Sequence, residues 1–201
     1  MLSEGQIGVR CGERFATYPE LFARAARAAT GLHGLGVGAG DRVALLLRNS
    51  LEFLEASIAT VPLGASAVPI NWHWRGEEIA HVLDDSAAKV LVVHADLWPA
   101  IAERLPDGVA LVIVPGEGEH ERPERALYWP DWLSVNEPWA EPPEASPVSI
   151  IYTSGTTGRP KGVVRTPATP QQREAVQGLI AEIFQLGEGE RTVIPAPMYH
   201  T

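Results

Sequence analysis

The sequence predicts an α/β fold: layered, with a mostly parallel sheet and flanking helices. The candidate strands are short, unbroken apolar runs, which is typical of strands buried on both faces of a parallel sheet. Candidate strands and helices also alternate along the chain, as they do in layered α/β proteins. The 201 residues, 45% of them hydrophobic, fit one domain or two small ones, with a core that buries roughly 70% of the unfolded surface.

The first helix is expected to begin after Thr17, because Thr17 and Glu20 have the spacing of a capping box. Apolar side chains then recur at helical spacing. The residues expected on this buried face are Leu21, Phe22, Ala25, Ala28, Ala29 and Leu32. Arg24 and Arg27 are expected on the opposite, solvated face. The helix should end near residues 34–36, where glycine readily adopts a left-handed cap.

Further elements are expected to alternate along the chain. The glycine-rich run at 34–40 follows a helix and lacks the G-x-G-x-x-G spacing, so it is interpreted as a cap and turn, not a dinucleotide-binding loop. Strands are expected at 43–47, 66–70, 89–93, 110–114, 149–152 and 191–194. A helix is expected after a cap at Asn49 or Ser50, with Leu51, Leu54, Ile58 and Val61 inward, and Pro62 is expected to end or kink it. Further helices are expected at 77–84, 96–105 and 171–186.

Residues 115–147 interrupt this alternation. They hold seven prolines, eight acidic residues and two arginines, and so contribute −6 of the net charge of −9. We expect an irregular surface segment that is nevertheless packed, because Trp129, Trp132 and Trp139 need apolar neighbours. Binding of an aromatic ligand by these tryptophans is the alternative.

Composition excludes several classes of function. A net charge of −9 argues against a general nucleic-acid binder. A single cysteine, Cys11, excludes a disulfide framework and a multi-cysteine zinc site and favours a reducing, cytoplasmic location. The N-terminus lacks the pattern of a signal peptide. The uncharged stretch 56–74 contains Pro62 and Pro69 and is not expected to span a membrane.

The predicted loop at 153–162 carries the chemistry. It is rich in glycine, which lets a backbone approach a ligand and turn successive N–H groups toward an anion. Hydroxyl donors come from Thr153, Ser154, Thr156 and Thr157. Lys161, one of only two lysines beside 14 arginines, adds a compact positive charge suited to phosphate oxygens. These residue types predict a polyphosphate-binding loop, although the order G-K-[ST] of a Walker loop is not present.

Residues 152–162 read Tyr-Thr-Ser-Gly-Thr-Thr-Gly-Arg-Pro-Lys-Gly. This run resembles the phosphate-loop signature of the AMP-forming adenylating superfamily, which includes acyl-CoA synthetases, luciferases and the adenylation domains of peptide synthetases. Other segments that resemble the family lie at 36–44, 48–50, 63–65, 68–71 and 197–200. The resemblance covers nearly the whole chain.

The resemblance implies an acid–thiol ligase. A carboxylate, from a fatty acid or another acyl acid, attacks ATP to give an acyl-adenylate and pyrophosphate, and a thiol, usually that of CoA, then takes the acyl group. Mg²⁺ is implied with ATP. The residues implied to bind phosphate are Thr153, Ser154, Gly155, Thr156, Thr157, Gly158 and Lys161. Tyr199 and His200 are implied to lie at the acyl site and pantetheine tunnel. No catalytic residue or metal ligand is assigned in this chain.

The resemblance also implies an incomplete N-terminal domain of an adenylate-forming enzyme. Its expected parts are a first α/β part at 1–114, the acidic proline-rich segment at 115–147 and a phosphate-loop part at 148–201. The adenine and magnesium motifs and the C-terminal lid of the family are expected beyond this sequence, so the chain alone is expected to be inactive. Two alternatives stay open: an enzyme that loads an amino or aryl acid onto a carrier protein, and a non-catalytic nucleotide-binding remnant.

Overall fold

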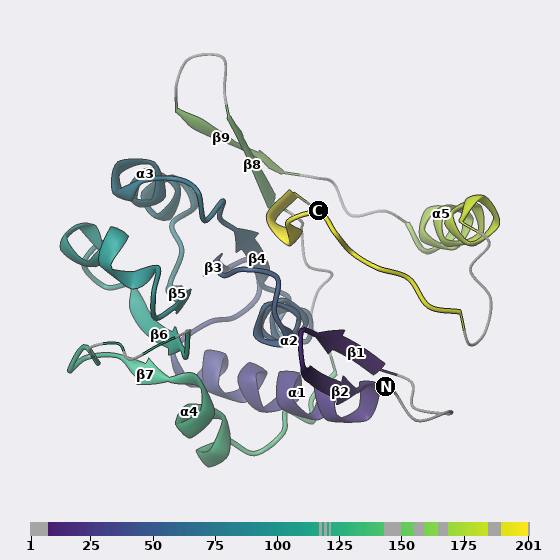
Figure 1. Ribbon diagram of the computed structural model, residues 1–201, viewed down its shortest axis with the longest axis horizontal. Coiled ribbons are helices and arrows are strands. Elements are labelled where there is room, and N and C mark those ends of the chain that lie inside the picture. Colours follow the sequence, from purple (N-terminus) through teal and green to yellow (C-terminus); the bar gives the residue numbers. More distant parts are fainter. Residues whose placement is uncertain are drawn as a thin grey trace.

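The computed structural model describes residues 8–116, 118, 120, 122–142, 150–154, 159–164, 169–184 and 190–200. The elements of the first half are β1 (Gly8–Cys11), β2 (Arg14–Thr17), α1 (Tyr18–Gly34), β3 (Arg42–Leu46), α2 (Leu51–Thr60), β4 (Ser66–Pro69), α3 (Gly76–Ser86) and β5 (Val90–His94). Those of the second half are the 3₁₀ turns η1 (Trp98–Ala100) and η2 (Ala102–Arg104), β6 (Ala110–Val114), β7 (Leu127–Tyr128), α4 (Trp129–Val135), β8 (Ile150–Ser154), β9 (Pro160–Val164), α5 (Pro170–Ile183) and η3 (Met198–His200). Figure 1 shows their arrangement.

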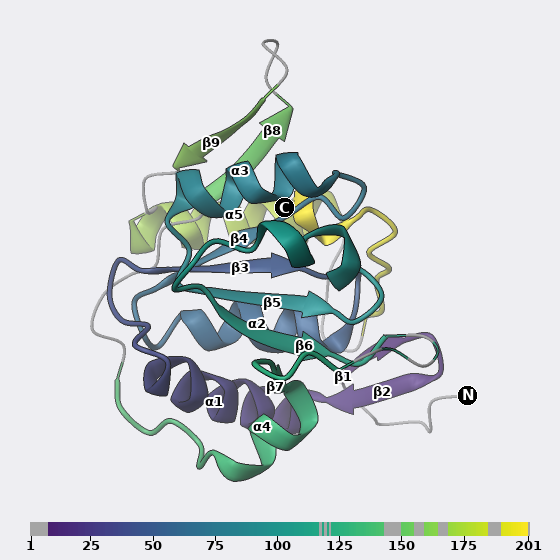
Figure 2. The ribbon, with the colours of Figure 1, turned by 90° about the vertical axis from the view of Figure 1, so that its left-hand side faces the viewer.

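The centre of the molecule is a five-stranded sheet in the order β4-β3-β5-β6-β7. Every neighbouring pair is parallel. Helices α1 and α2 lie on one face of this sheet and α3 on the other (Figure 2). The predicted layered α/β class is therefore confirmed, and the unbroken apolar strands are explained by burial on both faces.

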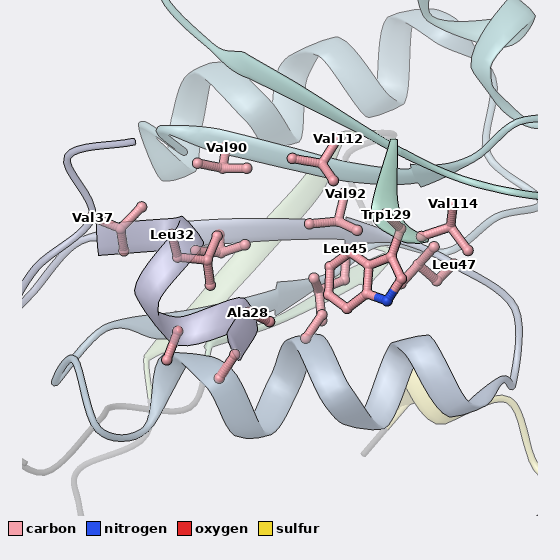
Figure 3. Close-up of a cluster of buried hydrophobic side chains, with 14 of the residues drawn as sticks. Ala28, Leu32, Val37, Leu45, Leu47, Val90, Val92, Val112, Val114 and Trp129 are labelled. Atoms are coloured by element: carbon pink, nitrogen blue, oxygen red, sulfur yellow. The ribbon is translucent and has the colours of Figure 1, made fainter. Parts of the chain in front are cut away.

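Successive residues from Val43 to Leu47 alternate between two hydrophobic cores. Val43, Leu45 and Leu47 pack toward α1 and α2. Figure 3 shows Leu45 and Leu47 in this core with Val90, Val92 and Trp129. Ala44 and Leu46 pack toward α3 with its Ile79, Val82 and Leu83. This two-residue alternation is the geometry of a strand, so one short strand contributes to both layers.

Helix α1 confirms the predicted start and corrects the predicted faces. Thr17 accepts the N–H of Glu20 and the Glu20 side chain accepts the N–H of Thr17, as a capping box requires. Phe22, expected inside, is 54% exposed. Arg24 and Arg27 are half-buried, not solvated. Arg24 donates to Glu55, and Arg27 donates to the carbonyl of Asn136. The prediction failed because these partners come from distant segments.

Helix α2 begins after Ser50, one of the two expected caps, but is rotated relative to the predicted buried face. Leu51 is buried as expected, whereas Leu54 and Ile58 are only half-buried and Val61 is 43% exposed. The side chains that enter the core are Leu51, Phe53, Ala56 and Ala59. The helix packs against both α1 and the sheet, so its buried surface is wider than one stripe.

Three other predictions are corrected. The expected helix at 96–105 is two 3₁₀ turns, in a segment where Pro99 has no N–H to donate to a longer helix. The expected strand at 191–194 is not regular, and Val193 is 82% exposed without a neighbouring strand in the described residues. The segment 115–147 contributes β7 and α4, although it was expected to be irregular.

The tryptophans of that segment pack as predicted. Trp129 and Trp132 are buried, and Trp139 packs at the margin of the same core. Trp129 thus belongs to the core and not to a ligand surface. No helix in the described part of the chain is long and apolar enough to cross a membrane.

Candidate active site

Polar side chains gather at the carboxyl ends of the parallel strands β3, β4 and β5, the edge at which open α/β sheets bind ligands. Arg48, just after β3, pairs with Asp96 at 2.5 Å between Nη1 and Oδ2. Its guanidinium also lies 5.4 Å from the centre of the Trp72 ring. The backbone N–H of Arg48 donates to Nδ1 of His94, at 3.1 Å. Burial lowers the pKa of His94 below its ordinary value, which favours the neutral ring that this bond requires.

Asn49 joins this edge to a segment almost 150 residues later. Its Nδ2 donates to the carbonyl of Ala196, and its Oδ1 accepts the N–H of Met198, each at 2.9 Å. One amide side chain therefore bonds the backbone on both sides of Pro197. These bonds fix the start of η3 against the loop that follows β3.

Tyr199 and His200, the predicted acyl-site pair, lie in η3. Tyr199 is buried and meets the Trp72 ring edge to face, with centroids 6.3 Å apart. His200 is exposed, and its ring lies 4.4 Å from that of Tyr199. The pair therefore has one aromatic side chain packed on the sheet edge and one imidazole open to solvent.

The predicted phosphate-binding segment is flanked by a β-hairpin. Strands β8 and β9 are antiparallel, and Thr153 pairs with Lys161 while Ser154 pairs with Pro160. The sequence predicted a loop over 153–162, so the prediction is wrong for the ends of this range, which are strand. Of the predicted phosphate-binding residues, Gly155, Thr156, Thr157 and Gly158 lie outside the described residues.

The two faces of the hairpin differ in chemistry. Thr153 and Lys161 are directly opposite and exposed, and side chains at such positions share a face with Cβ atoms about 5 Å apart. A hydroxyl and an ammonium thus stand side by side. The neighbouring pair, Tyr152 and Gly162, points the other way, toward α3, where the Tyr152 hydroxyl donates to Asp85.

The structure brings both predicted groups to the same edge strand. β4 contacts β8 of the hairpin and also contacts η3. In Figure 1 the base of the hairpin and the C-terminal turn lie beside β4. Sequence reasoning did not assign roles to Asn49, Trp72 and Asp85. Only Asn49 had a signal, because it lies in the segment 48–50 that resembles the adenylating superfamily.

The family of this chain follows from its match to known protein families. The model of the AMP-binding enzyme family matches residues 5–201. The chain belongs to the AMP-binding enzyme family. The match includes the β8–β9 hairpin and η3, so both parts of the candidate site lie inside the matched region.

Relatives of this chain include ligases of different acids. Long-chain-fatty-acid–CoA ligase FadD13 of Mycobacterium tuberculosis (strain ATCC 25618 / H37Rv) is 35% identical over 188 residues, which cover 92% of this chain and 35% of that protein. Acetoacetyl-CoA synthetase from Streptomyces lividans has a TM-score of 0.75 at 26% identity, covering 92% of this chain and 31% of the other. The anthranilate CoA ligase AuaEII, solved with anthranoyl-AMP, has a TM-score of 0.70 at 33% identity, covering 77% and 30%. The chain thus spans about a third of the length of FadD13.

Proposed function

We propose that this chain provides the phosphate-binding part of an AMP-forming acyl-CoA ligase. The observation that carries the proposal is the family match over residues 5–201, which spans the whole run from Tyr152 to Gly162. The exposed Thr153–Lys161 face of the hairpin supports it, because a hydroxyl and an ammonium side by side suit phosphate oxygens.

The proposed reaction has two steps. A carboxylate oxygen attacks the α-phosphorus of ATP, the bond from that phosphorus to the oxygen bridging the α- and β-phosphates breaks, and pyrophosphate leaves with the bonding electron pair, which gives the acyl-adenylate. The thiol of CoA then loses its proton to solvent and attacks the acyl carbon, and AMP leaves with the bonding electron pair. Negative charge grows on the pyrophosphate in the first step, so groups that bind it there accelerate the reaction.

The roles of the chain's own residues follow from this chemistry. The ammonium of Lys161 forms charge-assisted hydrogen bonds to the departing pyrophosphate. Hydroxyl donors of the same proposed site are Thr153, Ser154, Thr156 and Thr157, and Gly155 and Gly158 let the backbone approach. Tyr199 and His200 shape the acyl side. The acid itself is proposed only as an acyl acid, because the named relatives act on different ones.

Mg²⁺ is expected to accompany ATP, where it would neutralise phosphate charge. Within the described ranges, no three His, Cys, Asp or Glu side chains gather as a metal site. The described residues thus offer no such cluster, and the proposed roles above use only the protein's own donors.

The proposal is tested with Lys161→Ala in the longer ligase of which this chain is proposed to be a part. We expect carboxylate-dependent exchange between ATP and pyrophosphate to fall by about 10²-fold, the effect of removing one donor to developing charge. The matched control is Lys89→Ala, the only other lysine of the sequence. Lys89 bonds Asp41 and the Gly36 carbonyl on the surface, so its loss should leave exchange unchanged. Equal exchange by the Lys161→Ala variant and wild type would overturn the proposal.

We further propose that the chain forms the N-terminal portion of a longer ligase, with three parts at 1–114, 115–147 and 148–201. We also propose that these 201 residues alone do not catalyse the reaction. The share of FadD13 that it covers, 35%, supports this. The same exchange assay on the isolated chain should give no carboxylate-dependent signal. Robust exchange by the isolated chain would contradict it.

A further inference from the structure

Helix α3 contacts both strands of the hairpin through two side chains one turn apart. Asp85 Oδ2 accepts the hydroxyl of Tyr152 on β8, at 2.6 Å. Nε2 of His81 lies 3.0 Å from the carbonyl oxygen of Pro160 on β9. A carbonyl can only accept, so the imidazole donates from Nε2. Residues four apart share one face of a helix, and here that face holds the strand that enters 155–158 and the strand that leaves it.

The pairing of Tyr152 with Gly162 makes these contacts possible. A Cβ added at Gly162 would lie 2.8 Å from Cζ of Tyr152 and 3.0 Å from its hydroxyl. A side chain there would therefore displace the ring from Asp85. Burial, together with the hydrogen bond to Asp85, raises the pKa of the Tyr152 phenol well above its ordinary range, so the hydroxyl keeps the proton that it donates.

Helix α3 is itself fixed to the sheet. Its Ile79, Val82 and Leu83 are almost fully buried in the core that also contains β3 and β5. β8 is also held at the sheet, because it contacts β4 and because its Ile150 and Tyr152 are buried in the same core as α3. For β9 the largest contact outside the hairpin among the described residues is α3. Loss of the His81 and Asp85 contacts would therefore loosen the hairpin, and β9 most of all, without detaching it.

We propose that Asp85, assisted by His81, is a positioning residue that holds the β8–β9 hairpin, and with it Thr153 and Lys161, in place for the pyrophosphate of ATP. This inference rests on the proposed function. Asp85 does not touch the reacting atoms, because Tyr152 points to α3 while Lys161 stands on the opposite face of the hairpin.

The first test measures backbone hydrogen exchange of the 201-residue chain. Asp85→Ala should accelerate exchange about tenfold in 150–154 and 160–164 and leave β3 and β5 unchanged. Asp84→Ala is the matched control, since Asp84 is the adjacent exposed carboxylate of α3. Tyr152→Phe should reproduce the effect, and Asp85→Asn, which keeps an acceptor, should retain most of the protection. Unchanged hairpin exchange, or equal acceleration in all strands, would overturn the inference.

The second test uses kinetics in the ligase. Asp85→Ala should lower kcat/KM for ATP in pyrophosphate exchange about tenfold while the KM for the carboxylic acid stays the same, and Asp85→Asn should recover most of it. Lys161→Ala is measured beside it. A normal rate for Lys161→Ala means that the proposed function fails. A slow Lys161→Ala variant with a normal Asp85→Ala variant means that only the positioning role fails.

Discussion

Replacement of Asn49 by alanine removes both bonds that hold η3 to the loop after β3. Each bond measures 2.9 Å, and a hydrogen bond contributes about 0.5–1.5 kcal/mol net. The bond to Ala196 is exposed and contributes at the low end, so the loss should total about 1–2 kcal/mol. Since 1.4 kcal/mol is a factor of ten, the N–H of Met198 should become accessible to solvent about 5–30 times more often.

Hydrogen exchange read by mass spectrometry over residues 196–200 measures this directly. Asn136→Ala is a suitable control, because the side-chain amide of Asn136, just after α4, donates to the carbonyl of Trp132 within that helix. This variant removes one hydrogen bond from a side-chain amide to a backbone carbonyl without touching η3. Exchange at Met198 that stays at the wild-type rate in Asn49→Ala, or that rises as much in the control, would refute the reasoning.

Two further predictions concern buried titratable groups. Glu55 is fully buried and accepts three hydrogen bonds, two from Arg24 and one from the indole of Trp129. Glu55→Ala should lower the free energy of unfolding, measured in urea, by about 3 kcal/mol, and Glu55→Gln should lower it by less. An unchanged urea midpoint for the alanine variant would contradict this. The pKa of His94 is lowered by burial, so the unfolded chain binds more protons below the ordinary value of 6.5. The contribution of His94 to the free energy of unfolding should therefore decrease as the pH falls through 6.5. His94→Asn, whose Oδ1 can accept the Arg48 N–H, should reduce this pH dependence.

The sequence predicted the features that depend on near neighbours. The capping box joins Thr17 and Glu20, which are three positions apart, and the apolar runs of β3, β5 and β6 carry their own burial signal. The buried partner of Arg24 could not be predicted in this way. Glu55 lies 31 residues further along the chain, and a carboxylate is ordinarily taken as a surface residue.

The same limit explains the site. Lys161 could be selected from its type and its neighbours, and Tyr199 and His200 from the resemblance of their motif. Asp85 bonds a tyrosine 67 residues away, and Asn49 bonds backbone atoms 147 and 149 residues away. Nothing in the local pattern of either residue marks such contacts, and the resemblance at 48–50 singles out Asn49 without saying what it bonds. They depend on the order of the strands, which the alternation of apolar runs does not determine.

The order of the strands also separates charge. The acidic segment supplies β7 at one edge of the sheet, and the hairpin with Lys161 lies beside β4 at the other. Four steps between neighbouring strands span roughly 19 Å, more than two Debye lengths of about 8 Å at physiological ionic strength. A polyanion approaching the hairpin would therefore meet little repulsion from Glu124 and Asp131, the carboxylates that flank β7 in the sequence.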